Sequence, residues 1–131
     1  MARIRSFNVT IPVASGAGTG YSPYFSGYIE SIELLTGATY TDDQVDITIT
    51  ADVTGESILA RTNQDLTTLP LRWRPRAATH GTDGVVAEYV DATAVSAVND
   101  RIALSRDRVK IVIADGGTAK TGTFRVTVSE D

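Results

Sequence analysis

Apolar residues recur at every second position through most of the chain, as is typical of strands with one buried face and one solvated face. The clearest case is Val45, Ile47 and Ile49, which alternate with aspartate and threonine. A first strand over 7–13 alternates in the same way, and its Pro12 predicts an edge strand or a strand end, because proline cannot donate a ladder hydrogen bond. Helical spacing is nearly absent. The pattern therefore predicts an all-β protein.

About eight short strands are expected along the chain. The predicted segments are 7–13, 25–35, 45–50, 57–61, 69–76, 85–90, 109–113 and 124–128. In the second segment two sets of apolar residues compete for the inward face, and a β-bulge would reconcile them. We expect two hairpins, one across the turn 52–55 and a terminal one across the turn 115–117.

Three stretches read as loops rather than strands. The stretch 14–23 contains Gly16, Gly18 and Gly20 among small residues, which is typical of a flexible loop. A polar loop is expected over 77–83. The stretch 91–100 could form one helical turn or a loop, and we favour the loop.

Short strands at regular spacing, with turn residues between them, are typical of a β sandwich or jelly roll. An immunoglobulin domain is the weaker choice, since the chain has no cysteine pair. At 131 residues, with no linker or shift in composition, we expect one antiparallel domain over 1–131.

The charge and the missing residue types exclude several classes of protein. A formal net charge of −4 argues against a protein that coats nucleic acid, and we expect no direct nucleic-acid partner. The absence of cysteine excludes disulfides, cysteine-ligated zinc and thiol chemistry. The apolar runs are too short to cross a bilayer, and no signal-peptide-length apolar block follows the first residues, so neither membrane association nor signal-directed secretion is expected.

Residues that could carry chemistry are few. His80 is the single histidine, so one chain cannot build a multi-histidine metal site, and no nucleophile elbow accompanies it. Asp42, Asp43 and Asp46 could share a calcium ion but lack the EF-hand pattern. Gly16, Gly18 and Gly20 are not followed by the helix that a phosphate cradle requires. Glu30 and Glu33 would point to opposite faces of a regular strand. We therefore expect no catalytic residue, no metal and no cofactor, and predict that the protein is not an enzyme.

Two surface features could contact a partner. Tyr21, Tyr24, Phe25 and Tyr28 could form an aromatic platform for a sugar, although clustered aromatic residues more often fill a core or an interface. Arg72, Arg74 and Arg76 share one strand face and could meet an acidic partner or phosphates. The alternative for the arginines, weighted equally, is a solvated face on which their stems shield the sheet.

The second half of the chain carries a family resemblance. The segments are PRAATH at 75–80, AVNDRIAL at 97–104, DRVKIVIA at 107–114 and KTGTF at 120–124. They resemble small virion structural proteins of tailed bacteriophages, namely the head cement or decoration proteins of short-tailed Bordetella-type phages. The likeness covers most of the chain and is densest from Trp73 onward.

This resemblance implies a jelly-roll protein that is made in the host cytoplasm and assembles on the outer surface of the capsid. Its partners would be the major capsid protein and a second copy of itself, in a homodimer or alternatively a trimer. The expected contact residues are Phe7, Val9, Tyr21, Tyr24, Phe25, Arg72, Arg74 and Arg76.

Three other functions remain open at this stage. The first is a carbohydrate-binding or fibre-type β-sandwich module, and the second is a low-copy neck or head–tail connector protein. A small hydrolase is the least favoured.

Overall fold

The computed structural model describes the backbone of residues 3–41, 44–80, 82–91 and 94–130, and their side chains except those of 89–91 and 94–96. These ranges consist of strands, turns and connecting segments. They contain no helix of the length and apolar character needed to span a membrane.

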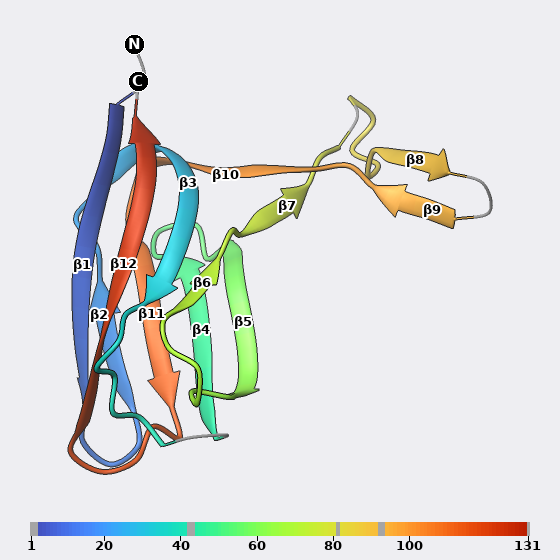
Figure 1. Cartoon of the computed structure of the whole chain (residues 1–131). Coiled ribbons are helices and arrows are strands. Elements are labelled where there is room, and N and C mark those ends of the chain that lie inside the picture. Colours follow the sequence, from blue (N-terminus) through green and yellow to red (C-terminus); the bar gives the residue numbers. More distant parts are fainter. Residues whose placement is uncertain (1–2, 42–43, 81, 92–93, 131) are drawn as a thin grey trace.

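Ten strands form two packed antiparallel sheets, of six and four strands, and eight of the ten make up the sandwich (Figure 1). Within the sandwich the first sheet has the order β1 (Arg3–Val13), β12 (Lys120–Glu130), β3 (Phe25–Leu34) and β10 (Asn99–Asp107), and two short strands extend it. The second has the order β2 (Gly18–Tyr21), β11 (Val109–Ala114), β4 (Val45–Ala51) and β5 (Ser57–Gln64). Except at the β4–β5 hairpin, successive members of this set lie in opposite sheets, which is the connectivity of a jelly roll. The predicted all-β sandwich of jelly-roll type is confirmed.

One hydrophobic core lies between the two sheets. Along β4 every second residue is buried, and Val45, Ile47 and Ile49 have no exposed surface. Phe124 and Ile11 enter the same core from the first sheet and are also fully buried. Burial of one such side chain contributes about 1.5–3 kcal/mol. The period-two pattern therefore identifies the inward face correctly.

Two finer predictions about the first sheet are confirmed. β1 is its edge strand, so Pro12 lies where a missing N–H donor is tolerated. The register between β3 and β12 shifts between Thr127 and Val128, which is the expected bulge, and Glu30 is the additional residue on β3. Ile29 and Ile32, on either side of the bulge, are consequently both buried.

The predicted loop over 14–23 is wrong in part, because it contains β2. This strand pairs with β11 through four residues, from Gly18 opposite Ile113 to Tyr21 opposite Lys110. A Cβ on Gly20 would lie 2.6 Å from Cγ1 of Ile11. The glycine is therefore required by close packing against β1, whereas glycine in an isolated sequence indicates a loop.

The predicted terminal hairpin is also wrong. β11 pairs with β2 and β4, whereas β12 pairs with β1 and β3, so the two strands lie in opposite sheets. The connection crosses the end of the sandwich, where Gly116 N–H donates to Gly16 O at 2.9 Å. Crossing lets both strands bury their apolar faces in one core from opposite sides.

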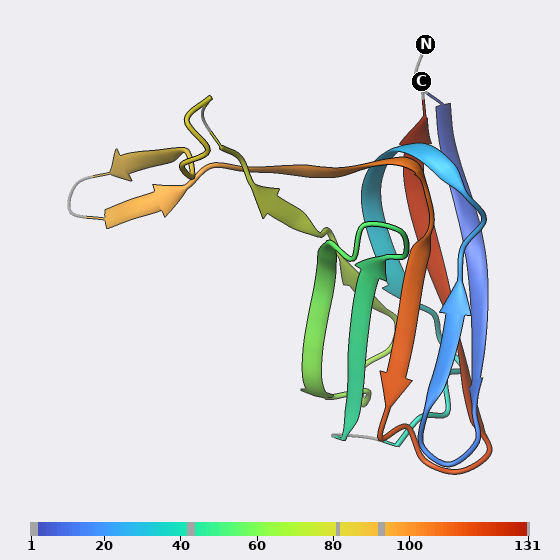
Figure 2. The same cartoon turned by 180° about the vertical axis from the view of Figure 1, so that it is seen from behind.

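Four short strands are inserted between β5 and β10. β6 (Leu71–Trp73) pairs with β3, and β7 (Arg76–Ala78) pairs with β10. β8 (Glu88–Asp91) and β9 (Ala94–Ala97) form a hairpin that projects far from the sandwich (Figures 1 and 2). We call the described residues of 76–101 the arm. The loops predicted over 77–83 and 91–100 are thus partly strands, and they lack the period-two pattern because, among their described side chains, Ala77 alone packs against the core.

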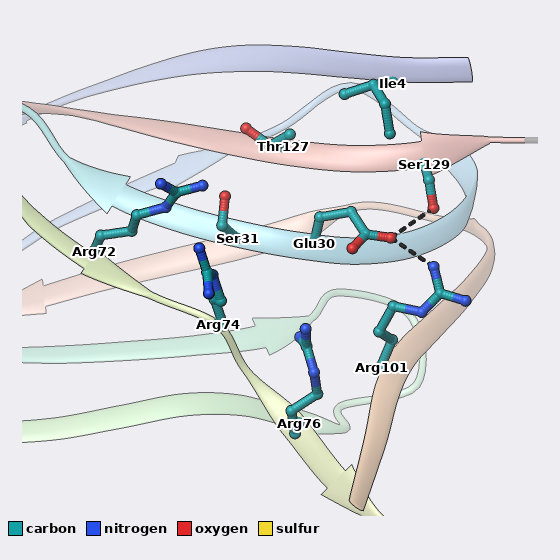
Figure 3. A pocket seen from close by; sticks show the side chains of 9 residues that line it. All are labelled: Ile4, Glu30, Ser31, Arg72, Arg74, Arg76, Arg101, Thr127 and Ser129. Carbon is teal, nitrogen blue, oxygen red and sulfur yellow. Dashed lines mark hydrogen bonds and ion pairs between the residues drawn. The ribbon is translucent and has the colours of Figure 1, made fainter. Parts of the chain in front are cut away.

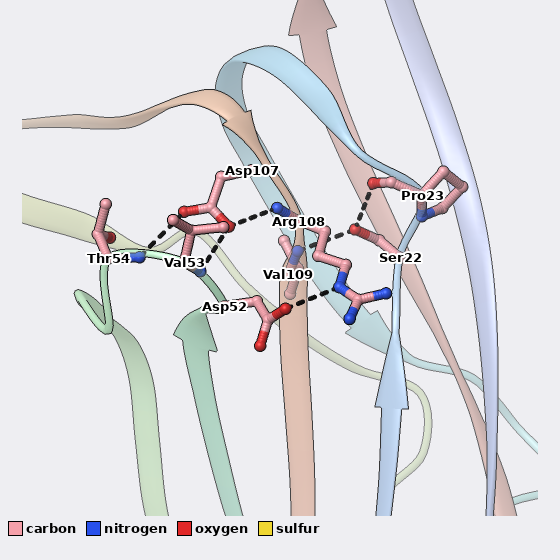
Figure 4. Close-up of polar contacts among 8 residues, drawn as sticks. All are labelled: Ser22, Pro23, Asp52, Val53, Thr54, Asp107, Arg108 and Val109. Carbon is pink, nitrogen blue, oxygen red and sulfur yellow. Dashed lines mark hydrogen bonds and ion pairs between the residues drawn. The ribbon is translucent and has the colours of Figure 1, made fainter.

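The strand β10 returns from the arm and passes into β11 at a sharp corner (Figure 4). Asp107 is only 1% exposed there, and it accepts hydrogen bonds from the backbone N–H groups of Val53, Thr54 and Arg108. Burial alone would raise the pKa of Asp107, but these backbone donors lower it below its usual value. The carboxylate therefore ties the β4–β5 turn to the point where the chain changes sheets.

Candidate functional site

The arm is held together by backbone hydrogen bonds between three segments of chain. Thr79 N–H donates to Val98 O at 2.8 Å, and Val98 N–H donates to Ala87 O at 2.9 Å. Ala87 N–H in turn donates to Thr79 O at 2.8 Å. Beyond this junction the described part of the arm continues as the two-stranded β8–β9 hairpin.

Packing in the arm contrasts with packing in the sandwich. Among the side chains that the structure describes, none from 78–101 belongs to the hydrophobic core. Val85 and Val98 are instead 63% and 40% exposed. A two-stranded hairpin is only marginally stable in water without a third strand or an apolar face to pack on. The arm is thus an extended element, and its described valine side chains at 85 and 98 are available to a partner.

A polar groove lies at the root of the arm, on the outer face of the first sheet (Figure 3). It encloses about 530 Å³. The lining residues are Ile4, Glu30, Ser31, Arg72, Arg74, Arg76, Arg101, Thr127 and Ser129. We call it the arginine groove. Arg76 begins β7 and Arg101 lies on β10, so the groove and the arm share two strands.

Two of the four guanidinium groups are paired with carboxylates. Arg101 Nη1 donates to Glu30 Oε1 at 2.7 Å, and Ser129 Oγ donates to the same oxygen at 2.9 Å. Arg72 Nε lies 3.8 Å from Glu33 Oε1, a looser contact. The hydrogen bond from Arg101 lowers the pKa of Glu30 against the opposing effect of burial, and Ser129 lowers it further. Glu30 is therefore ionised at neutral pH.

The other two guanidinium groups form no salt bridge within the described residues, although the charge of Arg76 helps to lower the pKa of Glu30. Arg76 Nη1 donates only to the carbonyl of its neighbour Pro75, at 2.8 Å. Arg74 has no hydrogen bond or ion pair there, and both side chains are exposed. Four arginines against Glu30 and Glu33 leave an excess positive charge in the groove, although the whole chain carries a net charge of −4.

Ser31 lies at the bottom of the arginine groove, on β3. The residue is 2% exposed, and its hydroxyl has no hydrogen-bond partner among the described residues. A buried polar group left in this state costs about 1–3 kcal/mol. Such a group in a native fold is notable because most buried hydroxyls are paired, and it is consistent with a site shaped for a ligand atom.

The expectation that Glu30 and Glu33 point to opposite faces of the strand is wrong. Glu30 is the bulge residue of β3, and the bulge turns its side chain toward the outer face, where it meets Arg101. Glu33 meets Arg72 on the same side. Regular alternation fails here because the extra residue changes the phase of the strand.

The structure divides the eight predicted contact residues into three groups. Phe7, Val9 and Phe25 are at most 7% exposed and pack in the core, so their side chains are not available to a partner. Phe7 and Val9 were candidates as members of the N-terminal strand, and Phe25 was a candidate as a member of the aromatic cluster. The three arginines, by contrast, gather in the arginine groove as one cluster.

Tyr21 and Tyr24 are exposed and form a separate cluster at the β10–β11 corner. The guanidinium of Arg108 lies 4.0 Å from the ring centre of Tyr21 and 4.8 Å from that of Tyr24. Arg108 Nε is fixed in turn by Asp52 Oδ2 at 2.8 Å (Figure 4). Each ring therefore already has a cation against it, which reduces the aromatic surface open to a sugar.

Other candidates from the sequence have local structural roles or lie outside the described residues. His80 is exposed and forms an isolated β-bridge with Val86 in the arm. Asp46 accepts a hydrogen bond from the backbone of Asn63 at 2.9 Å, whereas Asp42 and Asp43 lie outside the described residues.

No family model, curated protein or solved structure matches this chain. The candidate site is therefore assigned from the geometry of the arm and of the arginine groove. The sequence did not predict six of the residues that line the groove, namely Ile4, Glu30, Ser31, Arg101, Thr127 and Ser129. They lie on the four strands β1, β3, β10 and β12, and the expected bulge in β3 was the single signal that pointed toward any of them.

Proposed function

We propose that this chain is a non-enzymatic virion structural protein that binds the outer surface of a phage capsid and cements neighbouring major capsid protein subunits. The observation that supports it most directly is the arm. A projecting ribbon with exposed Val85 and Val98, and no described side chain in the core, suits an element that completes its packing on another protein. The family resemblance of the sequence supports the same function.

The division of the molecule into a sandwich and a projecting arm suits a cementing function. The sandwich has a single hydrophobic core, and the arm extends the reach of the sandwich across a surface. Strands of the arm carry backbone groups that a partner strand can pair with, which is a common mode of protein association. Repeated over many copies, individually weak contacts of this kind stabilise an assembled shell by mass action.

The cementing unit is proposed to be a homodimer, with a trimer as the alternative. The outer strands of the sandwich, β1 in the first sheet and β2 and β5 in the second, offer edges for self-association. Light scattering and analytical ultracentrifugation of the purified protein give the oligomeric state directly.

The function is tested first by counting. Quantitative mass spectrometry of purified virions compares copies of this chain with copies of the major capsid protein. A ratio of the order of one supports a shell-wide cement protein. A few copies per particle indicate the neck or connector instead, and absence from the virion contradicts the proposal.

The contribution of the arm is tested by removing it at a defined point. Ala78 and Asn99 are paired across β7 and β10, so an Asn-Gly turn can replace 79–98 and close a two-residue hairpin. The described core loses no side chain, and we expect the thermal unfolding of the sandwich to remain cooperative. Binding to capsids that lack the protein, followed by co-sedimentation, should be lost.

A point-substitution pair provides the control. Val85 in the arm and Val53 in the β4–β5 turn are 63% and 68% exposed, so replacing either by serine removes a similar apolar surface. Val85→Ser should weaken capsid binding, whereas Val53→Ser should not. Equal capsid binding by both variants, together with normal binding by the arm deletion, would show that the arm does not contact the capsid.

A further inference from the structure

We infer that the arginine groove captures a carboxylate from an acidic segment of the protein partner, with Arg74, Arg76 and Ser31 as the groups that bind it. The inference deepens the proposed function, on which it rests for the identity of the partner. It assigns a specific chemical role to a site at the root of the arm.

The first support is the charge that remains after internal pairing. Glu30 and Glu33 engage Arg101 and Arg72, and this leaves Arg74 and Arg76 with donors that no described carboxylate accepts. A guanidinium presents two parallel N–H donors, which match the two oxygens of a carboxylate. Bringing such guanidiniums together on an otherwise acidic protein favours an anionic ligand at this place.

The second support is independent of charge. Ser31 Oγ is buried, unpartnered and on the face of β3 from which the arginines converge (Figure 3). An oxygen of a bound carboxylate can accept the hydrogen of this hydroxyl. The ligand would thereby satisfy a group that the described residues leave unsatisfied, which a solvated arginine stripe does not explain.

The composition of the groove favours a carboxylate over a phosphate. The groove already holds one carboxylate, that of Glu30, through the guanidinium of Arg101 and the hydroxyl of Ser129. Ile4, which is 64% exposed, borders the groove and offers apolar contact to the stem of a glutamate or aspartate. An acidic protein loop provides both features.

The position of the groove gives this contact a further consequence. Arg76 and Arg101 are paired residues on β7 and β10, the strands through which the arm joins the sandwich. A carboxylate held by Arg76 therefore fixes the root of the arm. Capture of the acidic segment and docking of the arm are then expected to reinforce each other.

The experiment uses the intact protein and three defined probes. The probes are the peptide acetyl-Gly-Glu-Gly-Glu-Gly-amide, its glutamine counterpart and inorganic phosphate. Binding is followed by the NMR signals of the arginine Nε–H groups during titration. The variants are Arg74→Gln and Ser31→Ala, with Arg61→Gln on β5 of the opposite sheet as the control for loss of one charge.

We expect the glutamate peptide to shift the arginine signals of the groove and the glutamine peptide to leave them unchanged. Arg74→Gln should weaken binding about tenfold or more, as expected when charge-assisted hydrogen bonds are lost. Ser31→Ala should weaken binding a few fold, yet leave thermal stability unchanged or higher, because it removes an unsatisfied hydroxyl. Opposite effects on binding and stability separate a binding role from a structural one.

Three results would overturn the inference. They are no shift with the glutamate peptide, equal weakening by Arg61→Gln and Arg74→Gln, and tighter binding of phosphate than of the peptide. The last would assign the groove to a phosphate ligand. None of these results depends on virions, so a failure here is distinguishable from a failure of the copy-number measurement.

Discussion

The carboxylate of Asp107 is predicted to be a main support of the sandwich. It accepts three backbone hydrogen bonds, from Arg108 N–H at 2.7 Å, Val53 N–H at 2.9 Å and Thr54 N–H at 3.4 Å. The first two reach Oδ1 and the third reaches Oδ2. Asp107→Asn keeps the shape of the side chain but removes the charge and turns one acceptor oxygen into a donor.

The loss in free energy of unfolding caused by Asp107→Asn follows from these three hydrogen bonds. A hydrogen bond to a charged group contributes about 1.5–3 kcal/mol and a neutral one about 0.5–1.5 kcal/mol. Weakening the two bonds to Oδ1 therefore lowers the free energy of unfolding by about 2–3 kcal/mol, and loss of the long bond from Thr54, at 3.4 Å, adds little to this. With a urea dependence of about 1.5–2 kcal/mol per molar, the unfolding midpoint falls by about 1–2 M.

The same carboxylate predicts how stability depends on pH. The pKa of Asp107 in the folded chain lies below its ordinary value of 3.8. A lowered pKa stabilises the fold above the ordinary pKa, and this contribution is lost as the pH falls through the folded value. The difference between wild type and Asp107→Asn should therefore be full at pH 7 and shrink below about pH 4.

Urea unfolding at pH 7 and pH 3, followed by circular dichroism, measures both effects. Asp100→Asn on the same strand is the matched control, because Asp100 is exposed and accepts one hydrogen bond, from Arg101 N–H. Asp100→Asn should change the free energy of unfolding by no more than about 0.5 kcal/mol. A loss in Asp107→Asn that is no larger than in the control, or that is independent of pH, would refute the role given to the charge.

Three further outcomes are expected from the packing. Gly20→Ala should destabilise the fold by about 1–3 kcal/mol, measured by thermal unfolding beside Thr19→Ala, because its Cβ would overlap stiff side chains of β1. Tyr40→Phe should cost about 1–2 kcal/mol, since the buried hydroxyl donates to Ile11 O at 2.6 Å. Burial raises the pKa of Tyr40, so wild-type stability should also fall above pH 10, and Tyr40→Phe should fall less. Phe124→Ala should cost about 3–5 kcal/mol, and a smaller loss would show that the core collapses around the cavity.

How far the site could be predicted differs between its parts. The arginines at 72, 74 and 76 alternate on one short segment, so their shared face is visible in the sequence. Ser31 and Glu30 reach the same groove through the bulge in β3, and Arg101 reaches it from β10. No local pattern connects these strands, because their pairing depends on the order in which the sheet is assembled.

The sequence by itself determined the class of fold, the inward faces of the main strands and the placement of Pro12 on an edge strand or at a strand end. These follow from local physics, since a half-buried strand must alternate and a proline must avoid an inner ladder. The tertiary structure alone decided that β11 and β12 lie in opposite sheets, that the glycines of β2 pack against β1, and that 76–101 forms an arm. A turn such as 115–117 is compatible with a hairpin or with a crossing between sheets. Only the burial of both apolar faces in one common core selects between them.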